Sequence, residues 1–209
     1  MTNDKQSPLI YLVDDDDAVR DALALLLRSV GLRSQGFADP QAFLANHDRG
    51  AIGCLLLDIR MPGMSGLDVL DQLAASDLPV IMLTGHGNVD LCRRAFKSGA
   101  VEFLQKPVDD DVLLDAVQKA VRQHIASRER QAATLAARQK LARLSGRELD
   151  VLQRIADGLS NKEIARELAL SPRTVETYRA NVFTKLEVDT LAQLIRHYLV
   201  LLAEGPAAR

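Results

Sequence analysis

The sequence predicts an α/β fold followed by an all-α domain: a five-stranded, parallel, doubly wound sheet, then a helical linker and four short helices. Short apolar runs alternate with amphipathic stretches through the first 122 residues. Neither Gly nor Pro interrupts residues 110–145, which indicates one long helix. Four helix-start signals then follow. We therefore expect domains over 8–122 and 144–202, with a helical linker over 123–143.

The strands of the first domain are predicted from apolar runs, and its helices from the amphipathic stretches between them. The apolar runs are 9–13, 32–37, 53–57, 79–83 and 101–105. The helical stretches are 16–30, 39–46, 66–75, 88–98 and 110 onward. Because strands and helices alternate, we expect a parallel sheet covered on both faces.

The second domain is predicted from its capping residues. Three residue pairs have the spacing of capping boxes: Ser145 with Glu148, Ser160 with Glu163, and Thr190 with Gln193. The fourth signal is Ser171, which precedes a proline that suits a first helical position. Along the long helix that includes the linker, apolar residues follow a roughly heptad spacing, so a short coiled-coil seam stays open beside a plain helix. They are Leu114, Val117, Val121 and Leu135.

Charge divides unevenly along the 209 residues. Residues 1–122 carry 18 acidic and 12 basic side chains, a net charge of −6, and the remainder carries 10 and 14, a net charge of +4. This split favours a cation-binding and a polyanion-binding half, although ordinary surface variation also accounts for it.

The two cysteines lack metal or disulfide spacing. No apolar stretch reaches membrane-spanning length and no signal peptide is evident, so we expect a cytoplasmic protein.

Carboxylates follow two of the predicted strands. Asp14 and Asp15 come after the first run, and Asp58 after the third. The carboxyl ends of parallel strands meet at one edge, where α/β sheets bind ligands. Three carboxylates there repel one another unless a cation lies among them, and magnesium prefers such oxygen ligands. A lone Asp after a strand is usually a helix cap, and we assign that role to Asp16 or Asp17.

A hydroxyl and an ammonium group join the same edge. Thr84 ends the fourth strand, and Lys106 ends the fifth. This set fits phosphoryl transfer to a carboxylate: Asp58 attacks, Lys106 neutralises phosphoryl oxygens and Thr84 donates a hydrogen bond. Because Pro107 follows Lys106, we expect a cis peptide bond that directs the lysine inward.

These residues resemble the receiver domain of two-component response regulators, over about 8–122. The motifs are VDDD at 13–16, DIRMPGMSG at 58–66, TGHG at 84–87 and FLQKP at 103–107. The resemblance implies Asp58 as phosphoacceptor and a magnesium (or manganese) ion bound by Asp58, Asp15, Asp14 and the carbonyl of Arg60. It also implies Thr84 and Phe103 as a switch pair that moves on phosphorylation. Phe103 stands where many receivers carry Tyr.

The segment 160–186 has helix-turn-helix dimensions. On its second helix, Arg173, Thr177 and Asn181 lie opposite the apolar face, with Thr174 and Lys185 on one flank. We interpret this face as a recognition helix for the major groove, and Lys162 as a phosphate contact. A solvated face of an ordinary bundle stays open. Arg179 lies inside the apolar arc, so we predict that it is partly buried and paired with Glu148 or Glu163.

Residues 144–198 resemble the LuxR-type helix-turn-helix domain, through GLSNKEIA at 158–165 and SPRTVE at 171–176. The chain thus resembles the FixJ/NarL class of transcriptional regulators, closest to the FixJ group. The resemblance implies a sensor histidine kinase, double-stranded promoter DNA and RNA polymerase as partners. It also implies a homodimer formed on phosphorylation.

Two other functions fit part of the pattern. Haloacid-dehalogenase-like phosphatases also use a strand-end Asp, a hydroxyl and a lysine, but they need an acid two residues after the nucleophile, where this chain has Arg60. We therefore expect no multiple-turnover enzyme. A module whose helical half binds protein instead of DNA is the other alternative, and salt-dependent binding to promoter DNA distinguishes it.

Overall fold

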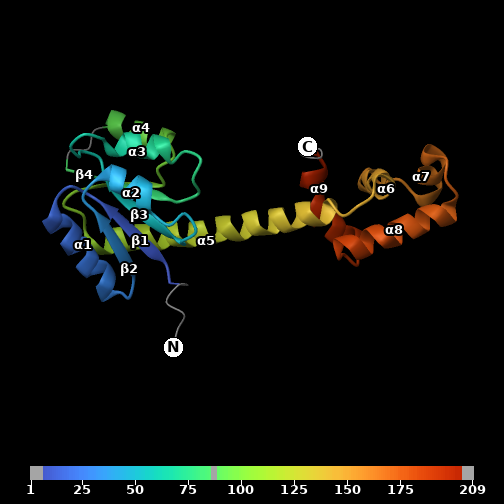
Figure 1. The fold of residues 1–209 in the computed structure, drawn as a ribbon, viewed down its shortest axis with the longest axis horizontal. Helices are drawn as coiled ribbons and strands as arrows, with labels where there is room; N and C mark the ends of the chain where they lie inside the picture. The colour runs from blue at the N-terminus through green and yellow to red at the C-terminus, as the bar shows by residue number, and fades with distance from the viewer. Residues whose placement is uncertain (1–6, 86–88, 204–209) are drawn as a thin grey trace. The chain divides into compact units, whose positions relative to one another are not determined.

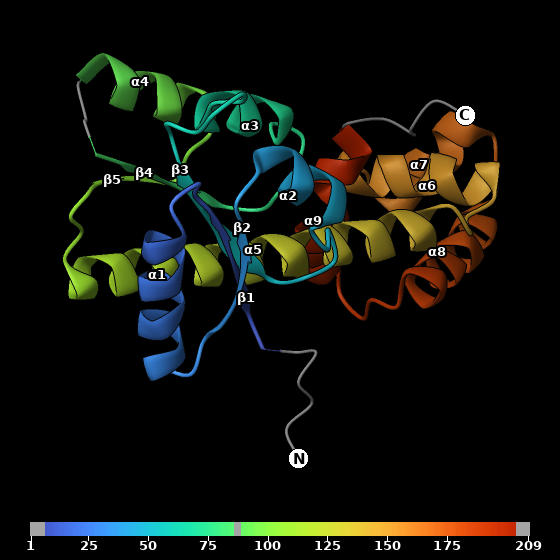
Figure 2. The ribbon, with the colours of Figure 1, turned by 60° about the vertical axis from the view of Figure 1, so that its left-hand side comes forward.

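The computed structural model describes residues 7–85 and 89–203, apart from the side chains of 199, 200, 202 and 203 (Figures 1 and 2). The chain divides between residues 129 and 130 into two compact units, each with its own core. In these ranges, none of the helices combines the length and the apolar composition that a membrane crossing requires.

The first unit is a five-stranded parallel sheet with the strand order β2-β1-β3-β4-β5, which confirms the predicted fold class. The strands are β1 (Leu9–Val13), β2 (Arg33–Phe37), β3 (Gly53–Asp58), β4 (Val80–Thr84) and β5 (Glu102–Gln105). The register pairs Val13 with Leu57 and Asp58 with Leu83. The residues that follow β1, β3 and β4 therefore lie at one edge of the sheet.

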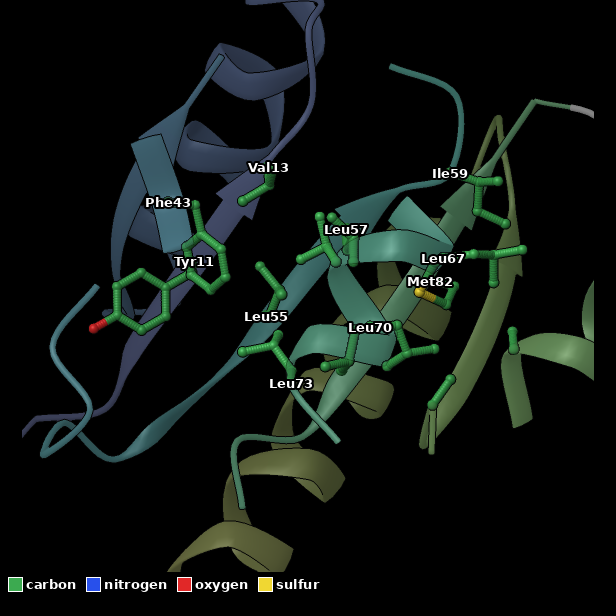
Figure 3. Packing of buried hydrophobic residues seen from close by; sticks show 14 of the residues in the cluster. Tyr11, Val13, Phe43, Leu55, Leu57, Ile59, Leu67, Leu70, Leu73 and Met82 are labelled. Carbon is green, nitrogen blue, oxygen red and sulfur yellow. The ribbon is translucent and has the colours of Figure 1, made fainter. Parts of the chain in front are cut away.

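Helices cover both faces of this sheet, as predicted. They are α1 (Asp17–Ser29), α2 (Pro40–Asn46), α3 (Gly66–Gln72), α4 (Val89–Lys97) and the first part of α5 (Asp110–Leu141). On one face, Tyr11, Leu55 and Met82 pack against Phe43 of α2 and Leu67 of α3 (Figure 3). Because side chains alternate along a strand, the intervening residues form a second core on the other face, with α1 and α5.

The second unit packs α6 (Gly146–Ala156), α7 (Asn161–Leu168), α8 (Pro172–Leu186) and α9 (Leu191–Ala203) around one apolar cluster. Ser145 and Ser160 both form complete capping boxes, and Ser171 caps α8. At Thr190 only half of the predicted box forms, because the Gln193 side chain accepts the amide hydrogen of Asp189.

The predicted linker is a continuous part of α5, and both of its ends belong to the compact units. His124, near its start, is 1% exposed and lies against Gly53 at the beginning of β3. Ala137 and Leu141, near its end, pack against the core of the second unit. The freely exposed part of α5 is thus shorter than residues 123–143.

Candidate functional site

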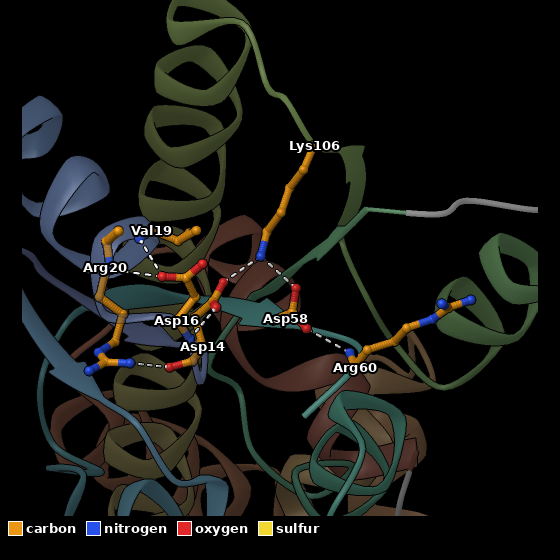
Figure 4. Close-up of polar contacts among 8 residues, drawn as sticks. Asp14, Asp16, Val19, Arg20, Asp58, Arg60 and Lys106 are labelled. Atoms are coloured by element: carbon orange, nitrogen blue, oxygen red, sulfur yellow. Dashed lines mark hydrogen bonds and ion pairs between the residues drawn. The ribbon is translucent and has the colours of Figure 1, made fainter. Parts of the chain in front are cut away.

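Four strand ends bring together the side chains that the sequence places at the sheet edge. Asp14 follows β1, Asp58 and Thr84 end β3 and β4, and Lys106 follows β5. Asp14, Asp58 and Thr84 are only 3%, 6% and 1% exposed. The β-strand register therefore produces a compact polar site at this edge of the sheet (Figure 4).

Lys106 joins the two buried carboxylates. Its Nζ lies 2.5 Å from Oδ2 of Asp14 and 2.6 Å from Oδ1 of Asp58. The peptide bond to Pro107 is cis, as predicted. Partial burial by itself lowers the pKa of Lys106, but the hydrogen bonds that it donates to Asp14 and Asp58 outweigh burial and hold that pKa above its usual 10.5. Lys106 is therefore charged at neutral pH.

Backbone groups orient both carboxylates toward the lysine. The amide of Arg60 donates to Oδ2 of Asp58 at 2.6 Å, and the amide of Asp16 donates to Oδ1 of Asp14 at 3.1 Å. The Arg20 guanidinium donates to the Asp14 carbonyl oxygen at 2.6 Å. One oxygen of each carboxylate is thus held by the main chain, while the other faces Lys106 (Figure 4).

The oxygen donors at this edge are of the kind that divalent cations prefer. Asp14 and Asp58 face the same ammonium group, whereas Asp15 is exposed and lines an adjoining cavity of about 630 Å³ with Arg60 and Arg94. In the described part of the chain, no group of three or more acidic, histidine or cysteine side chains is assembled as a metal cage. The carboxylates fit magnesium in their chemistry, and the role of Asp15 stays a prediction.

The switch residues and the helix cap occupy positions consistent with their predicted roles. Thr84 is fully buried, and Phe103 is half-buried and packs against the core beside Met82. Asp16 is the N-cap of α1, as one of our two alternatives proposed. Gly87 of the TGHG motif lies outside the described residues.

Two contacts at this site were missed by the sequence analysis. One is the hydrogen bond from Arg20 to the carbonyl oxygen of Asp14. The position of Arg20, one helical turn after the Asp16 cap, could have indicated it. The other is Gly66, where a Cβ atom would lie 2.1 Å from the carbonyl oxygen of Asp58. The first residue of α3 therefore packs directly on the backbone that carries the carboxylate, a contact that the glycine in DIRMPGMSG could have indicated.

The outward face of α8 matches the predicted recognition face in part. Arg173, Thr177 and Asn181 are exposed, and Val175 and Val182 are buried on the opposite side. Lys162 is exposed in the first turn of α7. Thr174 is half-buried, and its hydroxyl lies 2.7 Å from the Ser171 hydroxyl within the helix cap.

Lys185, which we predicted as a nucleic-acid contact, is half-buried and forms an ion pair within the second unit. Its Nζ lies 2.6 Å from Oε2 of Glu148, which is 4% exposed. A buried carboxylate requires a partner, and the long lysine side chain reaches it from the flank of α8.

Arg179 is half-buried as predicted, but its predicted carboxylate partner is wrong. Glu148 pairs with Lys185, and Glu163 with the Ser160 cap. The Arg179 guanidinium lies instead over the ring of Phe183, 5.9 Å from its centroid, in cation–π geometry.

Two family models match the chain. The response regulator receiver domain matches residues 10–118, which contain the polar site. The luxR family of bacterial regulatory proteins matches residues 142–198, which contain α6 to α8. The two matched regions lie on either side of the exposed part of α5.

Curated relatives cover nearly the whole chain. The transcriptional regulatory protein FixJ of Bradyrhizobium diazoefficiens is 44% identical over 90% of this chain and 92% of its own length. The response regulator protein TmoT of Ectopseudomonas mendocina is 40% identical over 93% and 89%.

Solved structures agree with these relatives. The response regulator StyR is 39% identical, covering 93% of this chain and 99% of its own, with a TM-score of 0.83. Full-length FixJ from B. japonicum is 43% identical over 92% and 96%, with a TM-score of 0.57. The chain therefore belongs to the response regulators of two-component systems, in the FixJ/NarL class of transcriptional regulators that join a receiver domain to a LuxR-type DNA-binding domain.

Proposed function

We propose that this regulator is switched when a sensor histidine kinase transfers a phosphoryl group to Asp58. The observation that carries the proposal is the ion pair between Asp58 and Lys106, 2.6 Å long and almost buried. The Asp58 oxygen attacks phosphorus as the bond to the leaving group of the donor breaks. Lys106 stays beside the product and offsets its added negative charge. Because the carboxylate attacks in its ionised form, no general base is needed.

The proposal includes a bound magnesium or manganese ion, with Asp14, Asp15, Asp58 and the Arg60 carbonyl as its ligands. When bound, the ion supplies further charge neutralisation at the phosphoryl oxygens. Thr84 supplies a hydroxyl donor from the end of β4, and Phe103 fills the space that Thr84 leaves when it moves. The burial of Thr84 and the half-buried position of Phe103 support this pairing.

Acetyl phosphate labelling tests the phosphoacceptor. We expect the wild-type protein to gain one phosphoryl group per chain in the presence of magnesium, and Asp58→Asn to gain none, because an amide oxygen is a poor nucleophile. Intact-protein mass spectrometry measures the added mass. Asp71→Asn, at an exposed acid on α3, is the matched control and should be labelled normally. Labelling of Asp58→Asn would place the acceptor elsewhere.

The same sample distinguishes a switch from a phosphatase. We propose stoichiometric labelling without sustained turnover, because Arg60 stands where a phosphatase of the haloacid-dehalogenase type needs an acid. Continued release of inorganic phosphate over many equivalents would support the enzyme instead.

For the second unit, we propose that α8 reads promoter DNA through Arg173, Thr177 and Asn181, with Lys162 on a phosphate. Their exposure on one side of α7 and α8 supports this set. Thr174 and Lys185 are left out of the direct contacts, since a helix cap and a buried carboxylate engage them. We keep residues 8–122 and 144–202 as the domain limits.

We further propose that phosphorylation produces a homodimer, which then binds two half-sites and recruits RNA polymerase. Exposed apolar side chains support self-association: Val89 and Phe96 on α4 are 74% and 46% exposed, and Leu191 and Ile195 on α9 are 41% and 38% exposed. Two linked DNA-binding units gain affinity without any new base contact. Sedimentation velocity with and without acetyl phosphate measures the change in mass.

A further inference from the structure

The second unit contains a cavity of about 560 Å³ between the C-terminal part of α5 and α9. Its floor is apolar: Tyr198 and Val188 are buried there, and Ala137 and Leu201 are half-buried. Figures 1 and 2 show α9 beside the end of α5. We call this cavity the α5–α9 groove.

The rim of the α5–α9 groove is strongly basic. Arg130, Arg138 and Lys140 line it from α5, and Arg196 lines it from α9. The one acidic residue among its lining residues is Glu187, whose carboxylate lies 2.6 Å from Nζ of Lys140. Basic side chains outnumber the single acidic one among these lining residues, so the groove is complementary to a negatively charged, partly apolar ligand.

The α5 wall of the groove has the form of a helix-packing surface. Its lining residues lie on one face of the helix with i, i+3, i+4 and i+7 spacing: Arg130, Ala133, Thr134 and Ala137. The small side chains at 133 and 137 allow a neighbouring helix to approach closely. The apolar floor and charged rim also match the usual anatomy of a protein–protein interface.

The groove is separate from the two surfaces discussed above. It lies at the C-terminal end of α8, beside Leu186 and Glu187, whereas Arg173 lies about 20 Å away along the helix axis. Leu191 and Ile195, the apolar pair assigned to self-association, do not line it. A ligand in the groove therefore leaves the first turns of the recognition face accessible.

We propose that the α5–α9 groove binds an acidic amphipathic helix of a partner protein. Apolar side chains of that helix enter the floor between α5 and α9, and its Asp and Glu residues pair with Arg130 and Arg196. This is helix-in-groove recognition, read by anchors at i, i+3, i+4 and i+7. A nucleic acid is a poorer match, because its phosphate backbone gains nothing from the apolar floor.

A model peptide tests the groove on the full-length chain. The probe is a fluorescein-labelled helical peptide of about 15 residues, with Leu at the anchor positions and Glu on the flanks. We expect fluorescence anisotropy to show saturable binding to the wild type. The double variant Arg130→Glu/Arg196→Glu should raise the Kd of the peptide at least tenfold, because two charged contacts of the interface are replaced by repulsive ones. Arg147→Glu, which makes the same charge change at an exposed residue of α6, should not.

A second variant separates shape from charge. Ala133→Leu fills the groove without changing charge and with only a small change in helix propensity, so it should also weaken binding of the peptide. Circular dichroism checks that each variant is folded. A peptide with Ser at the anchor positions should fail to bind.

Three results would overturn the proposal. If the Ser peptide bound as tightly as the Leu peptide, the groove would be a surface that binds anions without using its apolar floor. Displacement of the peptide from the wild type by duplex DNA of unrelated sequence, together with weaker direct binding of that DNA to the double variant, would make the groove a nucleic-acid contact. Loss of self-association in the double variant would make it an interface between copies of this chain.

Discussion

Lys106 controls the charge balance of the phosphoacceptor site. Two nearly buried carboxylates face its ammonium group, and its side chain is 23% exposed. A buried charge without a partner costs several kcal/mol, whereas a paired one is tolerated. The lysine thus gives both Asp14 and Asp58 a charged hydrogen-bond partner.

Replacing Lys106 with Met should lower the free energy of unfolding by about 3 kcal/mol in the absence of divalent cations, because two like charges are left buried together. Asp58→Asn in the same chain should restore part of this loss by removing one of the charges. Urea denaturation of the single and double variants gives the coupling. Lys119→Met, at an exposed position of α5, is the control and should change little. Additive effects of the two substitutions would contradict the pairing.

Glu148 introduces a pH dependence into the second unit. The hydrogen bond from Lys185 lowers the pKa of Glu148 below its usual 4.5 against the opposing effect of burial, and the amide of Ser145 acts in the same direction as Lys185. A carboxyl group with a depressed folded-state pKa contributes its stability above the unfolded pKa. That contribution is lost as the pH falls through the folded-state value.

We therefore expect α6 and α8 to be protected from hydrogen exchange at pH values above 4.5, and to lose part of that protection below it. Glu148→Gln should lack much of this pH-dependent difference, and its protection should be lower than that of the wild type at neutral pH. Mass spectrometry of residues 144–188, with variants compared at the same pH, measures the effect. Glu176→Gln on the exposed side of α8 should follow the wild type. An unchanged Glu148→Gln profile would rule out the pair as its origin.

The sequence was sufficient to predict Asp58, Thr84 and Lys106 as neighbours, because each directly follows or ends an apolar strand of a parallel sheet. It could not predict where long side chains on a helix flank point. Lys185 and Arg179 differ by six positions on α8, yet one reaches a buried carboxylate and the other a ring. Helix angle fixes only the Cα–Cβ direction, and the remaining torsions follow partners that are distant in sequence.

At the scale of elements, α5 packs on the sheet through an apolar face, and His124 adds one buried polar contact after the last of those apolar residues. Nδ1 of His124 lies 2.9 Å from the carbonyl oxygen of Gly53, and Nε2 accepts from Nε of Arg128 at 3.2 Å. Nε of Arg128 also lies 3.0 Å from Oδ2 of Asp77. These contacts hold the turn of α5 that follows the predicted domain limit at residue 122.

His124→Ala should destabilise the first unit by about 2–3 kcal/mol, through a lost buried hydrogen bond and a cavity. It should also raise hydrogen exchange in residues 120–129 more than in α1. Gln123→Ala, at the exposed neighbouring position, is the control. Chemical denaturation and exchange mass spectrometry provide the two readouts. Equal stability of both variants would show that Gly53 needs no partner from α5.

The bounds of helices and strands were predicted closely where the hydrophobic pattern is strong. The predicted strand 9–13, for example, has the same bounds as β1. The amphipathic pattern of α3 was extended to residue 75, but the helix ends at Gln72. The linker raises a different point, because its ends pack on the two units. A histidine in a polar helix carries no local signal that it will meet Gly53, 71 positions earlier, so only the tertiary structure shows where the sheet stops holding α5.

At the scale of the whole molecule, the uneven charge distribution matches the division into two units. The acidic part of the sequence contains the carboxylate site, and the basic part contains α7 and α8 with the proposed DNA face. This division was predictable from sequence because it needs only residue counts and a boundary within a helix without Gly or Pro.

Replacing Lys162 with Ala should weaken binding to promoter DNA and reduce the slope of log K against log salt by about 1, as expected for one lost phosphate contact. The effect should be similar on specific and unrelated DNA, since phosphates carry no sequence. Fluorescence anisotropy over a salt series measures it. Lys119→Ala, in the first unit, should leave the slope unchanged. An unaltered slope for Lys162→Ala would remove α7 from the proposed interface.

Gly66 and Gly53 have a further consequence for how mutational maps of this regulator are interpreted. A Cβ atom would lie 2.1 Å from the Asp58 carbonyl oxygen at position 66, and 1.7 Å from the Leu9 carbonyl oxygen at position 53. A saturation screen scored only by reporter output would rank both glycines beside the reactive aspartate, although neither has a functional group. Scoring protein abundance in the same cells would separate positions that hold the scaffold from positions that perform the chemistry.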